Sequence, residues 1–416
     1  MSRNLRIFSF AAVIFATVGL MNDATVMYVL AGVCAAVILA AFLLSQLAMT
    51  RLQVEMHLPA RRSVAGAAIR PSLTVTSVGS ITVGAVVELT ATNLTVPGVE
   101  VAQRLLLPPL PPASSVGLEV ELRPPARGRY RLGPALLIDS DPLGMFQSRS
   151  ARGEAFDLVV FPRTYDVPRV GAWETGFGRF FSRGRDARRD RGEFRGIREH
   201  TPGDDLRHVH WKVTAHVGEL AVKEYEPIRH DVISIHLDLG ADAHYGAGAT
   251  STLETAISAA ASLARAGLAE QRSVAVIGRG LPPGVARPGV GQAHLQRIMV
   301  ALAEAQPSRE LFIASLPAGL RQVPRGASVF IITTGAEEGL VQAISSVRSG
   351  AGSVTLLIVE GDLQSADQRF VERPRATMQA ARAAGMAVGL LRSPASLKEA
   401  LAAASGPGAA DRAGVA

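Results

Sequence analysis

Two long apolar segments without a single charge lie at the start of the chain and restrict its fold more than any other feature. They span residues 7–21 and 24–49, and only Asn22 and Asp23 separate them. The second segment exceeds the ~20 residues that a helix needs to cross a bilayer, whereas the first is short and needs snorkelling side chains or a thinner bilayer. The sequence therefore predicts a transmembrane helical hairpin within residues 1–50.

The charges around the hairpin predict its orientation. The turn carries only Asp23, whereas basic residues flank both outer ends of the hairpin. These basic residues are Arg3, Arg6, Arg51, Arg61 and Arg62. Because basic loops stay in the cytoplasm, we expect a multi-pass protein of the cell membrane that contacts lipid through two helices and has cytoplasmic soluble domains. The alternative is that the first segment is a cleaved signal peptide, although no convincing A-x-A site follows it.

Residues 51–165 have the pattern of a β-domain. Short alternating or apolar runs such as LTVTSV, LEVELRP and LVVFP are broken by Pro and Gly, and no long stretch has a helical period. Such spacing is typical of antiparallel sheets. We expect a β-sandwich-like domain here.

The rest of the chain divides into three parts. Residues 166–230 hold an Arg-rich stretch without periodicity, which predicts an exposed loop. In residues 231–405, five strand-like runs alternate with Ala-rich helical ones, with predicted helices at 252–269, 290–305, 337–348, 367–384 and 397–404. This alternation predicts a doubly wound parallel α/β domain. Residues 406–416 are Gly- and Ala-rich and predict a flexible tail.

Composition and missing motifs exclude several function classes. Hydrophobic residues make up 48% and charged residues 19% of the 416 residues, which excludes a disordered chain and a channel or transporter. The only cysteine, Cys34, lies in an apolar segment, so no soluble part can use a thiol nucleophile or an all-cysteine zinc site. Neither a phosphate-binding glycine loop nor a G-x-S-x-G or H-E-x-x-H motif occurs.

Two blocks resemble a bacterial family known as domain of unknown function 58. The first block runs from Arg127 to Phe146 and the second from Gly192 to Glu226. Their matching residues are Arg127, Gly128, Tyr130, Asp141, Pro142, Gly144, Phe146, Pro202, Gly203, Asp204, His210, Trp211 and Lys212. The resemblance implies a von Willebrand factor A-like fold from about Asp231 and a MoxR-type AAA+ ATPase as partner. It implies no established reaction.

Proteins with the von Willebrand A fold often hold Mg²⁺ through an Asp-x-Ser-x-Ser motif and later Thr and Asp residues. Here the first Asp is kept as Asp238, but Gly240 and Asp242 stand at the two hydroxyl positions, and Thr333-Thr334-Gly335 stands where the pattern has Thr-Asp-Gly. Asp238, Asp242 and Thr334 thus form a degenerate set. Because a hard cation requires several oxygen ligands, we expect no cofactor, with weak Mg²⁺ binding as the alternative.

The second block suggests a structural role. Pro202 and Gly203 predict a turn, and Asp204 or Asp205 can cap a short helix that ends at Gly218. Its apolar face would consist of Leu206, Val209 and Val213. We interpret Trp211 as a buried anchor on the α/β sheet, and the alternative is a ligand-stacking role. His208, His210 and His216 lack metal-ligand spacing.

The arginine-rich stretch admits several interpretations. Acidic residues alternate with its arginines, which are Arg179, Arg183, Arg185, Arg188, Arg189, Arg191, Arg195 and Arg198. A solvated loop of mixed charge is the default; the alternatives are anionic lipid headgroups and an acidic partner protein. We expect no nucleic acid binding, because few aromatic residues interleave with the arginines.

These observations predict a membrane-tethered, non-enzymatic scaffold or adaptor that docks a partner protein. An alternative from another class is an uncharacterised metal-dependent enzyme or hydrolase that uses Asp238, Asp242 and the block from Pro202 to Lys212.

Overall fold

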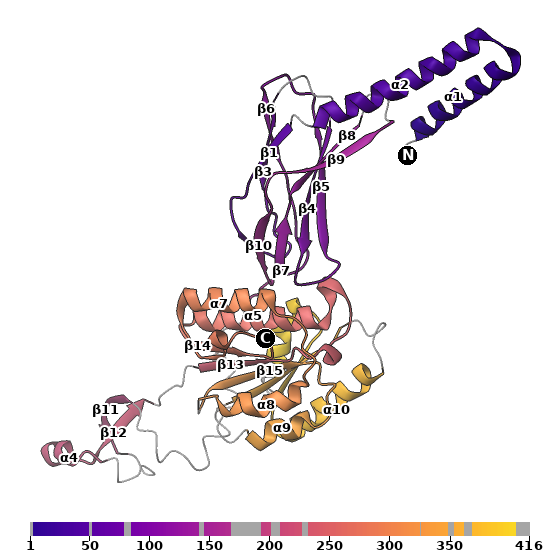
Figure 1. Ribbon diagram of the computed structural model, residues 1–416. Coiled ribbons are helices and arrows are strands. Elements are labelled where there is room, and N and C mark those ends of the chain that lie inside the picture. The colour runs from indigo at the N-terminus through magenta and orange to yellow at the C-terminus, as the bar shows by residue number, and fades with distance from the viewer. Residues whose placement is uncertain are drawn as a thin grey trace, which may run out of the picture. The chain divides into compact units, whose positions relative to one another are not determined.

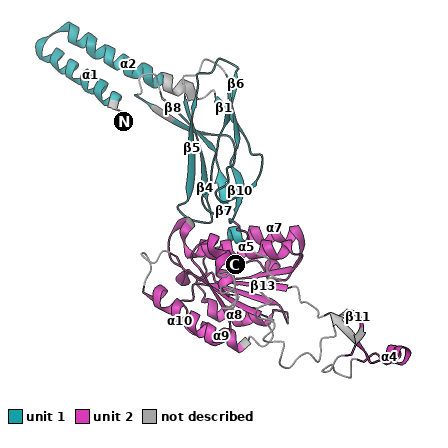
Figure 2. Cartoon of the chain, turned by 180° about the vertical axis from the view of Figure 1, so that it is seen from behind, with its two compact units in different colours: residues 1–163, 302–306 teal, residues 164–301, 307–416 magenta. Residues whose placement is uncertain are grey.

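The computed structural model divides the chain into two compact units (Figure 2). Unit 1 contains Met1–Arg163 and Leu302–Gln306, and unit 2 contains Thr164–Ala301 and Pro307–Ala416. The structure describes residues 3–49, 52–78, 85–140, 145–167, 193–200, 209–226, 232–324, 326–347, 353–361 and 368–404. The predicted Arg-rich loop between 168 and 192 and the predicted tail lie outside these residues.

Two apolar helices open the chain, as predicted. Helix α1 spans Arg3–Asn22 and helix α2 spans Thr25–Met49, and Figure 1 shows them as a hairpin. Each is long and apolar enough to cross a membrane, and most of its side chains are not buried within the protein. This supports membrane association, whereas the cytoplasmic side of the soluble units stays a prediction.

The rest of unit 1 consists of two mainly antiparallel sheets. The smaller sheet has the order β1-β3-β6, and the larger has the order β2-β10-β7-β4-β8-β9, with β5 paired to β4. The strands are β1 (Leu52–His57), β2 (Arg62–Val64), β3 (Ser72–Ser77), β4 (Ala85–Asn93), β5 (Glu100–Leu107), β6 (Ser115–Glu119), β7 (Gly128–Leu132), β8 (Ala135–Ser140), β9 (Gln147–Arg152) and β10 (Phe156–Phe161).

Alternation along the strands explains why the two sheets pack together. In β3 and β4, every second residue is buried, because successive side chains of a strand point to opposite faces. The inward residues of both sheets form one hydrophobic core, which includes Val54, Leu73, Leu89, Leu137 and Leu158.

Unit 2 contains the predicted parallel sheet. Its order is β14-β13-β15-β16-β17, and every neighbouring pair is parallel. The strands are β13 (Val232–Leu237), β14 (Ser273–Ile277), β15 (Ser328–Thr333), β16 (Ser353–Val359) and β17 (Ala387–Leu391). All six residues of β15 are buried, as expected for a central strand covered on both faces.

Helices lie on both faces of this sheet, with α5 and α7 on one face and α8, α9 and α10 on the other (Figure 1). Their bounds are α5 (Thr252–Ala269), α6 (Pro283–Ala286), α7 (Gly291–Glu304), α8 (Phe312–Arg321), α9 (Leu340–Val347), α10 (Arg369–Ala383) and α11 (Leu397–Ala404). Five of the seven match predicted helices, whereas α6 and α8 were not predicted.

A small antiparallel hairpin precedes the parallel sheet in the chain. It consists of β11 (Glu193–Glu199) and β12 (Ala221–Glu226), and helix α4 (Trp211–Val217) lies between them in sequence. The prediction that Val209 belongs to the helix is wrong, because Val209 forms a β-bridge with Val222 and His210 caps the helix. Gly218 ends the helix in a left-handed conformation, as predicted.

Candidate functional site

The candidate site lies at the carboxyl ends of β13 and β15 in unit 2. β13 is the first strand of the sheet in sequence, and β14 and β15 flank it on opposite sides. The chain therefore leaves β13 toward one side of the sheet and later returns on the other. In open α/β sheets, ligands bind at such a switch point.

Asp238 follows β13 and is completely buried. Its Oδ1 accepts a hydrogen bond from the Gly240 N–H at 2.9 Å, and its Oδ2 accepts one from the Thr333 hydroxyl at 2.7 Å. Burial raises the pKa of Asp238 to about 6, although both hydrogen bonds act in the opposite direction. The carboxylate thus joins the ends of β13 and β15.

Gly240 stands where the metal-binding pattern has its first serine, and the local geometry gives a reason. A Cβ at this position would lie 3.1 Å from Asp238 Oδ1 and 3.3 Å from the Cβ of Ala243. These distances are tighter than ordinary van der Waals contact. A serine here would crowd the carboxylate that the loop is folded around.

The three residues of the degenerate metal set lie at the same end of the sheet but differ in their surroundings. Asp238 and Thr334 are buried, and the Thr334 hydroxyl donates to the Ala243 carbonyl oxygen at 2.6 Å. Asp242 is exposed and lies in the 3-10 turn Ala241–Ala243. Among the residues that the structure describes, no group of three or more His, Cys, Asp or Glu side chains could hold a metal ion.

Sequence reasoning missed Glu337, which also lies in this region. Its Oε1 and Oε2 accept hydrogen bonds from the N–H groups of Phe312 and Ile313, at 3.1 and 2.8 Å. The carboxylate therefore caps the start of α8, where free N–H groups and the helix dipole favour negative charge. Desolvation raises the pKa of Glu337, the Ile313 N–H lowers it, and the nearby charge of Asp238 raises it further.

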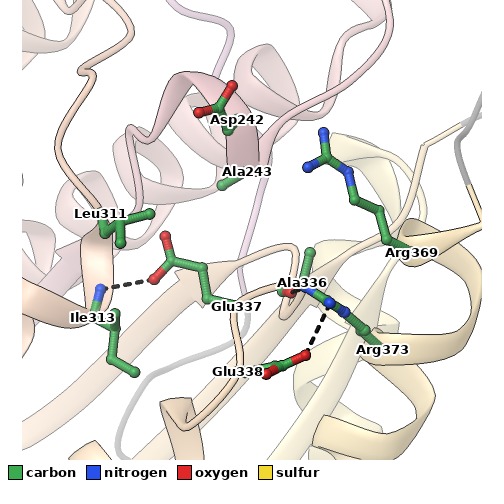
Figure 3. Close-up of a pocket in the computed structure, with 9 residues that line it drawn as sticks. All are labelled: Asp242, Ala243, Leu311, Ile313, Ala336, Glu337, Glu338, Arg369 and Arg373. Atoms are coloured by element: carbon green, nitrogen blue, oxygen red, sulfur yellow. Dashed lines mark hydrogen bonds and ion pairs between the residues drawn. The ribbon is translucent and has the colours of Figure 1, made fainter.

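A hollow of about 350 Å³ opens beside these residues (Figure 3). Three carboxylates, two guanidinium groups and four apolar residues line it: Asp242, Glu337, Glu338, Arg369, Arg373, Ala243, Leu311, Ile313 and Ala336. Arg373 forms an ion pair with Glu338 at 2.8 Å and donates to the Ala336 carbonyl oxygen. Leu311 is 56% exposed.

The first signature block is part of the interior of unit 1. The Tyr130 hydroxyl donates to the Ala126 carbonyl oxygen at 2.8 Å, and the Tyr130 side chain is fully buried. Gly128 has a φ of 139°, and a Cβ there would lie 2.5 Å from Asn93 Oδ1. Since Asn93 in turn donates to the Arg127 carbonyl oxygen, only glycine fits at this close approach.

Arg127 is the least expected buried residue of this block, with only 1% of its surface exposed. Its guanidinium group donates to the carbonyl oxygens of Leu302 and Ala305 at 2.7 and 2.6 Å, and these residues belong to the same compact unit. Leu302 lies in the last turn of α7 and Ala305 directly follows the helix, where the last carbonyls have no helical partner. Burial lowers the pKa of Arg127 to about 10, which leaves it charged near neutral pH.

The second signature block differs from the prediction. Trp211 is 65% exposed, and no residue of α4 is buried, so the interpretation of Trp211 as a buried anchor is wrong. The physical reason is that α4 is a single short segment of seven residues that packs no face into a core. Lys212 is also exposed, and His210 Nδ1 accepts a hydrogen bond from the Val213 N–H.

Six signature residues lie outside the described residues, so the structure says nothing of their placement. They are Asp141, Pro142 and Gly144 of the first block and Pro202, Gly203 and Asp204 of the second. The predicted cap at Asp204 or Asp205 also lies there.

Together, these features define a chain with two membrane-compatible helices, a β-rich unit and a doubly wound α/β domain with a hollow of charged and apolar residues at its switch point. The model of a family described as protein of unknown function DUF58 matches residues 196–362. This match covers most of the parallel sheet and His210, Trp211 and Lys212, and it supports the resemblance seen in the sequence. No curated protein matches the chain.

The solved structures that resemble the chain are distant. The CARDB domain of the PF1109 protein from Pyrococcus furiosus, in complex with di-metal ions, is 17% identical with a TM-score of 0.21; the match covers 26% of this chain and 91% of that one. A β-glucosidase from Listeria innocua is 10% identical with a TM-score of 0.18; the match covers 26% of this chain and 16% of that one. The alkylpurine DNA glycosylase AlkC from Pseudomonas fluorescens, bound to DNA, is 14% identical with a TM-score of 0.20; the match covers 34% of this chain and 41% of that one. This chain thus spans under half of the last two, and such scores carry no argument about function.

Proposed function

We propose that the chain is a membrane-tethered, non-enzymatic scaffold or adaptor whose cytoplasmic units dock a partner protein. The α1–α2 hairpin would anchor it in the cell membrane. The partner that the family resemblance implies is a MoxR-type AAA+ ATPase. It would supply energy from ATP hydrolysis, because the chain itself has no phosphate-binding glycine loop.

The exposure of Trp211 is the observation that carries this proposal. Large apolar side chains on a protein surface mark interaction sites when they gather in one place, and tryptophan is enriched among residues that dominate binding energy. Ile197 of β11, Val217 of α4 and Leu220, which directly precedes β12, are exposed as well. We call these four residues the Trp211 surface.

The α/β domain would be of the von Willebrand factor A type. Asp238 follows its first strand and Thr333 ends its third, the two places where that fold carries its ligand-binding residues. The departures at Gly240 and Thr334 argue for docking without a constitutive metal ion. The buried carboxylate of Asp238 already has a protein donor on each oxygen.

The alternative of a metal-dependent enzyme or hydrolase makes an opposite prediction about magnesium. A ligand that binds only the native state raises its stability. We expect millimolar Mg²⁺ to leave the melting temperature of the protein unchanged. A saturable rise of the melting temperature with Mg²⁺ would favour the enzyme alternative if the rise is abolished in Asp238→Ala but kept in Asp157→Ala of unit 1.

The docking proposal is tested by capture and melting on the same preparation. Tagged full-length protein, extracted from membranes in mild detergent, should retain one reproducible partner that mass spectrometry identifies. Trp211→Ala should lose that partner and keep its melting temperature, because truncation of an exposed side chain usually changes stability by less than ~0.5 kcal/mol.

Leu106→Ala provides a matched control. Leu106 is a large and strongly exposed apolar residue of β5, remote in sequence from the Trp211 surface. Its truncation should affect neither melting nor capture. The proposal would be refuted if wild type and Trp211→Ala recover equal amounts of the partner. It would also be refuted if Trp211→Ala loses the partner only because the variant is unfolded.

A further inference from the structure

The hollow beside Asp242 and Glu337 has a definite chemical preference. We infer that it receives an arginine side chain of the docked protein, with the guanidinium group between the two carboxylates and the aliphatic stem against Leu311. This inference rests on the docking function proposed above, and it adds a second contact to the Trp211 surface.

The charges that line the hollow are unequally partnered. Arg373 is paired with Glu338 at 2.8 Å, and Arg369 lies over the ring of Phe370 at 4.7 Å. Asp242, in contrast, forms no hydrogen bond or ion pair within the described part of the chain. Glu337 accepts only neutral backbone N–H groups. The side of the hollow formed by Asp242 and Glu337 therefore attracts a cation.

The geometry of Glu337 leaves room for this contact. Each oxygen of a carboxylate can accept two hydrogen bonds, and each oxygen of Glu337 accepts one from the start of α8. These bonds hold the carboxylate in place without filling its acceptor sites. Figure 3 shows its Oε1 turned toward the turn that carries Asp242 and Ala243.

An apolar wall selects a long basic side chain over a small cation. Leu311 and Ile313 lie on the left of the hollow in Figure 3, next to Glu337. Lysine and arginine cover apolar surface with their stems while their heads reach polar partners. A hydrated ion would gain nothing from Leu311, whereas an arginine stem would cover it.

Arginine fits better than lysine or a divalent metal ion. A guanidinium group has five donors in a planar fork and can bond two carboxylates at once. A divalent ion requires six or more oxygen ligands in a close array, and both oxygens of the neighbouring Asp238 are already bonded to protein donors.

Calorimetric titration of the full-length protein in detergent tests this inference with a defined probe. The probe is the blocked peptide acetyl-Gly-Leu-Arg-Leu-Gly-amide, and its control carries citrulline, which keeps the shape of arginine without the charge. We expect saturable binding of the arginine peptide at low salt and about tenfold weaker binding of the citrulline peptide, since hydrogen bonds to charged groups contribute that much.

Two protein variants locate the binding. Asp242→Asn should weaken the arginine peptide about tenfold. Glu372→Gln removes one charge from α10 at a side chain that does not line the hollow, and it should change the affinity less than about threefold, because solvent screens such charges.

Each other result overturns the inference. These results are no binding, equal binding of the citrulline peptide, tighter binding of a lysine peptide, an Asp242→Asn variant with unchanged affinity, or saturable Asp242-dependent binding of Mg²⁺ alone. If the arginine peptide does not bind while Trp211→Ala still loses the partner, the arginine inference is wrong and the docking function is supported. If it binds but no partner is captured, the docking function falls.

Discussion

The signature residues that the structure describes in the two blocks differ in their burial. In the first, Arg127, Gly128 and Tyr130 are buried and hydrogen-bonded in unit 1. In the second, Trp211 and Lys212 are exposed on a short helix of unit 2. Both blocks stand out in the sequence for the same reason, which is an unusual combination of charged, aromatic and glycine residues. Burial separates these residues: those of the first block pack into the interior of unit 1, whereas Trp211 and Lys212 of the second lie at the surface.

The largest effect should come from Arg127→Ala. Removing the guanidinium group deletes two charge-assisted hydrogen bonds and leaves the buried carbonyl oxygens of Leu302 and Ala305 without those donors. We expect the free energy of unfolding to fall by about 3 to 5 kcal/mol, measured by urea denaturation of the full chain in detergent.

Arg129→Ala is the matched control, two residues away on β7. Arg129 pairs with Asp157 at 2.8 Å, and both side chains are 51% exposed. Such a surface ion pair contributes at most about 1 kcal/mol. If the two variants lose equal stability, the buried role of the first block is wrong.

The buried interior of unit 2 offers a second contrast, between the pKa shifts of two residues at the carboxyl end of β13. Asp238 and His236 are both buried at the end of β13, yet burial raises the pKa of the first to about 6 and lowers that of the second to about 4. As the pH falls from about 6 to about 4, native Asp238 takes up a proton before the unfolded chain does, which stabilises the fold.

His236 acts with the opposite sign. Between about pH 6.5 and 4 the unfolded chain protonates this histidine while the native protein does not, so stability falls. Relative to wild type, Asp238→Asn should lose stability on acidification and His236→Gln should gain it, each by up to about 3 kcal/mol. Urea denaturation at both ends of this range measures the two differences, and differences of the same sign would contradict the assignment.

Local sequence signals explain which elements could be predicted. The bounds of α5 and α11 agree with the prediction because Ala-rich periodic segments follow clear starts, such as Ser251, whose side chain caps α5. Helix α8 was missed because it contains Pro317, and Leu311 at its start has no capping side chain. Its cap is Glu337, which lies 24 residues beyond Ile313 in the chain, so no local pattern reveals it.

The same reasoning separates the site residues. Asp238 could be found because it follows an apolar strand, and the carboxyl ends of parallel strands form ligand sites. Glu337 and the hollow could not, because they depend on the meeting of two loops with α8 and α10. The burial of Arg127 and the exposure of Trp211 run against the usual preferences of these residue types, so composition alone favours the wrong assignment for both.

A smaller effect is expected from Tyr130→Phe. The substitution keeps the buried ring but removes the hydrogen bond to the Ala126 carbonyl oxygen. A single buried bond of this kind contributes about 1 to 2 kcal/mol when its partner is left unsatisfied, so the midpoint of urea unfolding should fall modestly. An unchanged midpoint would mean that Tyr130 acts through packing alone.

The smallest effect on stability is expected from Trp211→Phe. Trp211 is 65% exposed at the start of a helix without buried residues, so unfolding should change by less than ~0.5 kcal/mol. Phenylalanine retains an aromatic surface but lacks the indole N–H and part of the area, so the variant should hold the partner more weakly than wild type and more strongly than Trp211→Ala. Melting and capture on one preparation measure both. A large loss of stability would show that Trp211 packs against the protein after all, and the two signature blocks would then share one structural role.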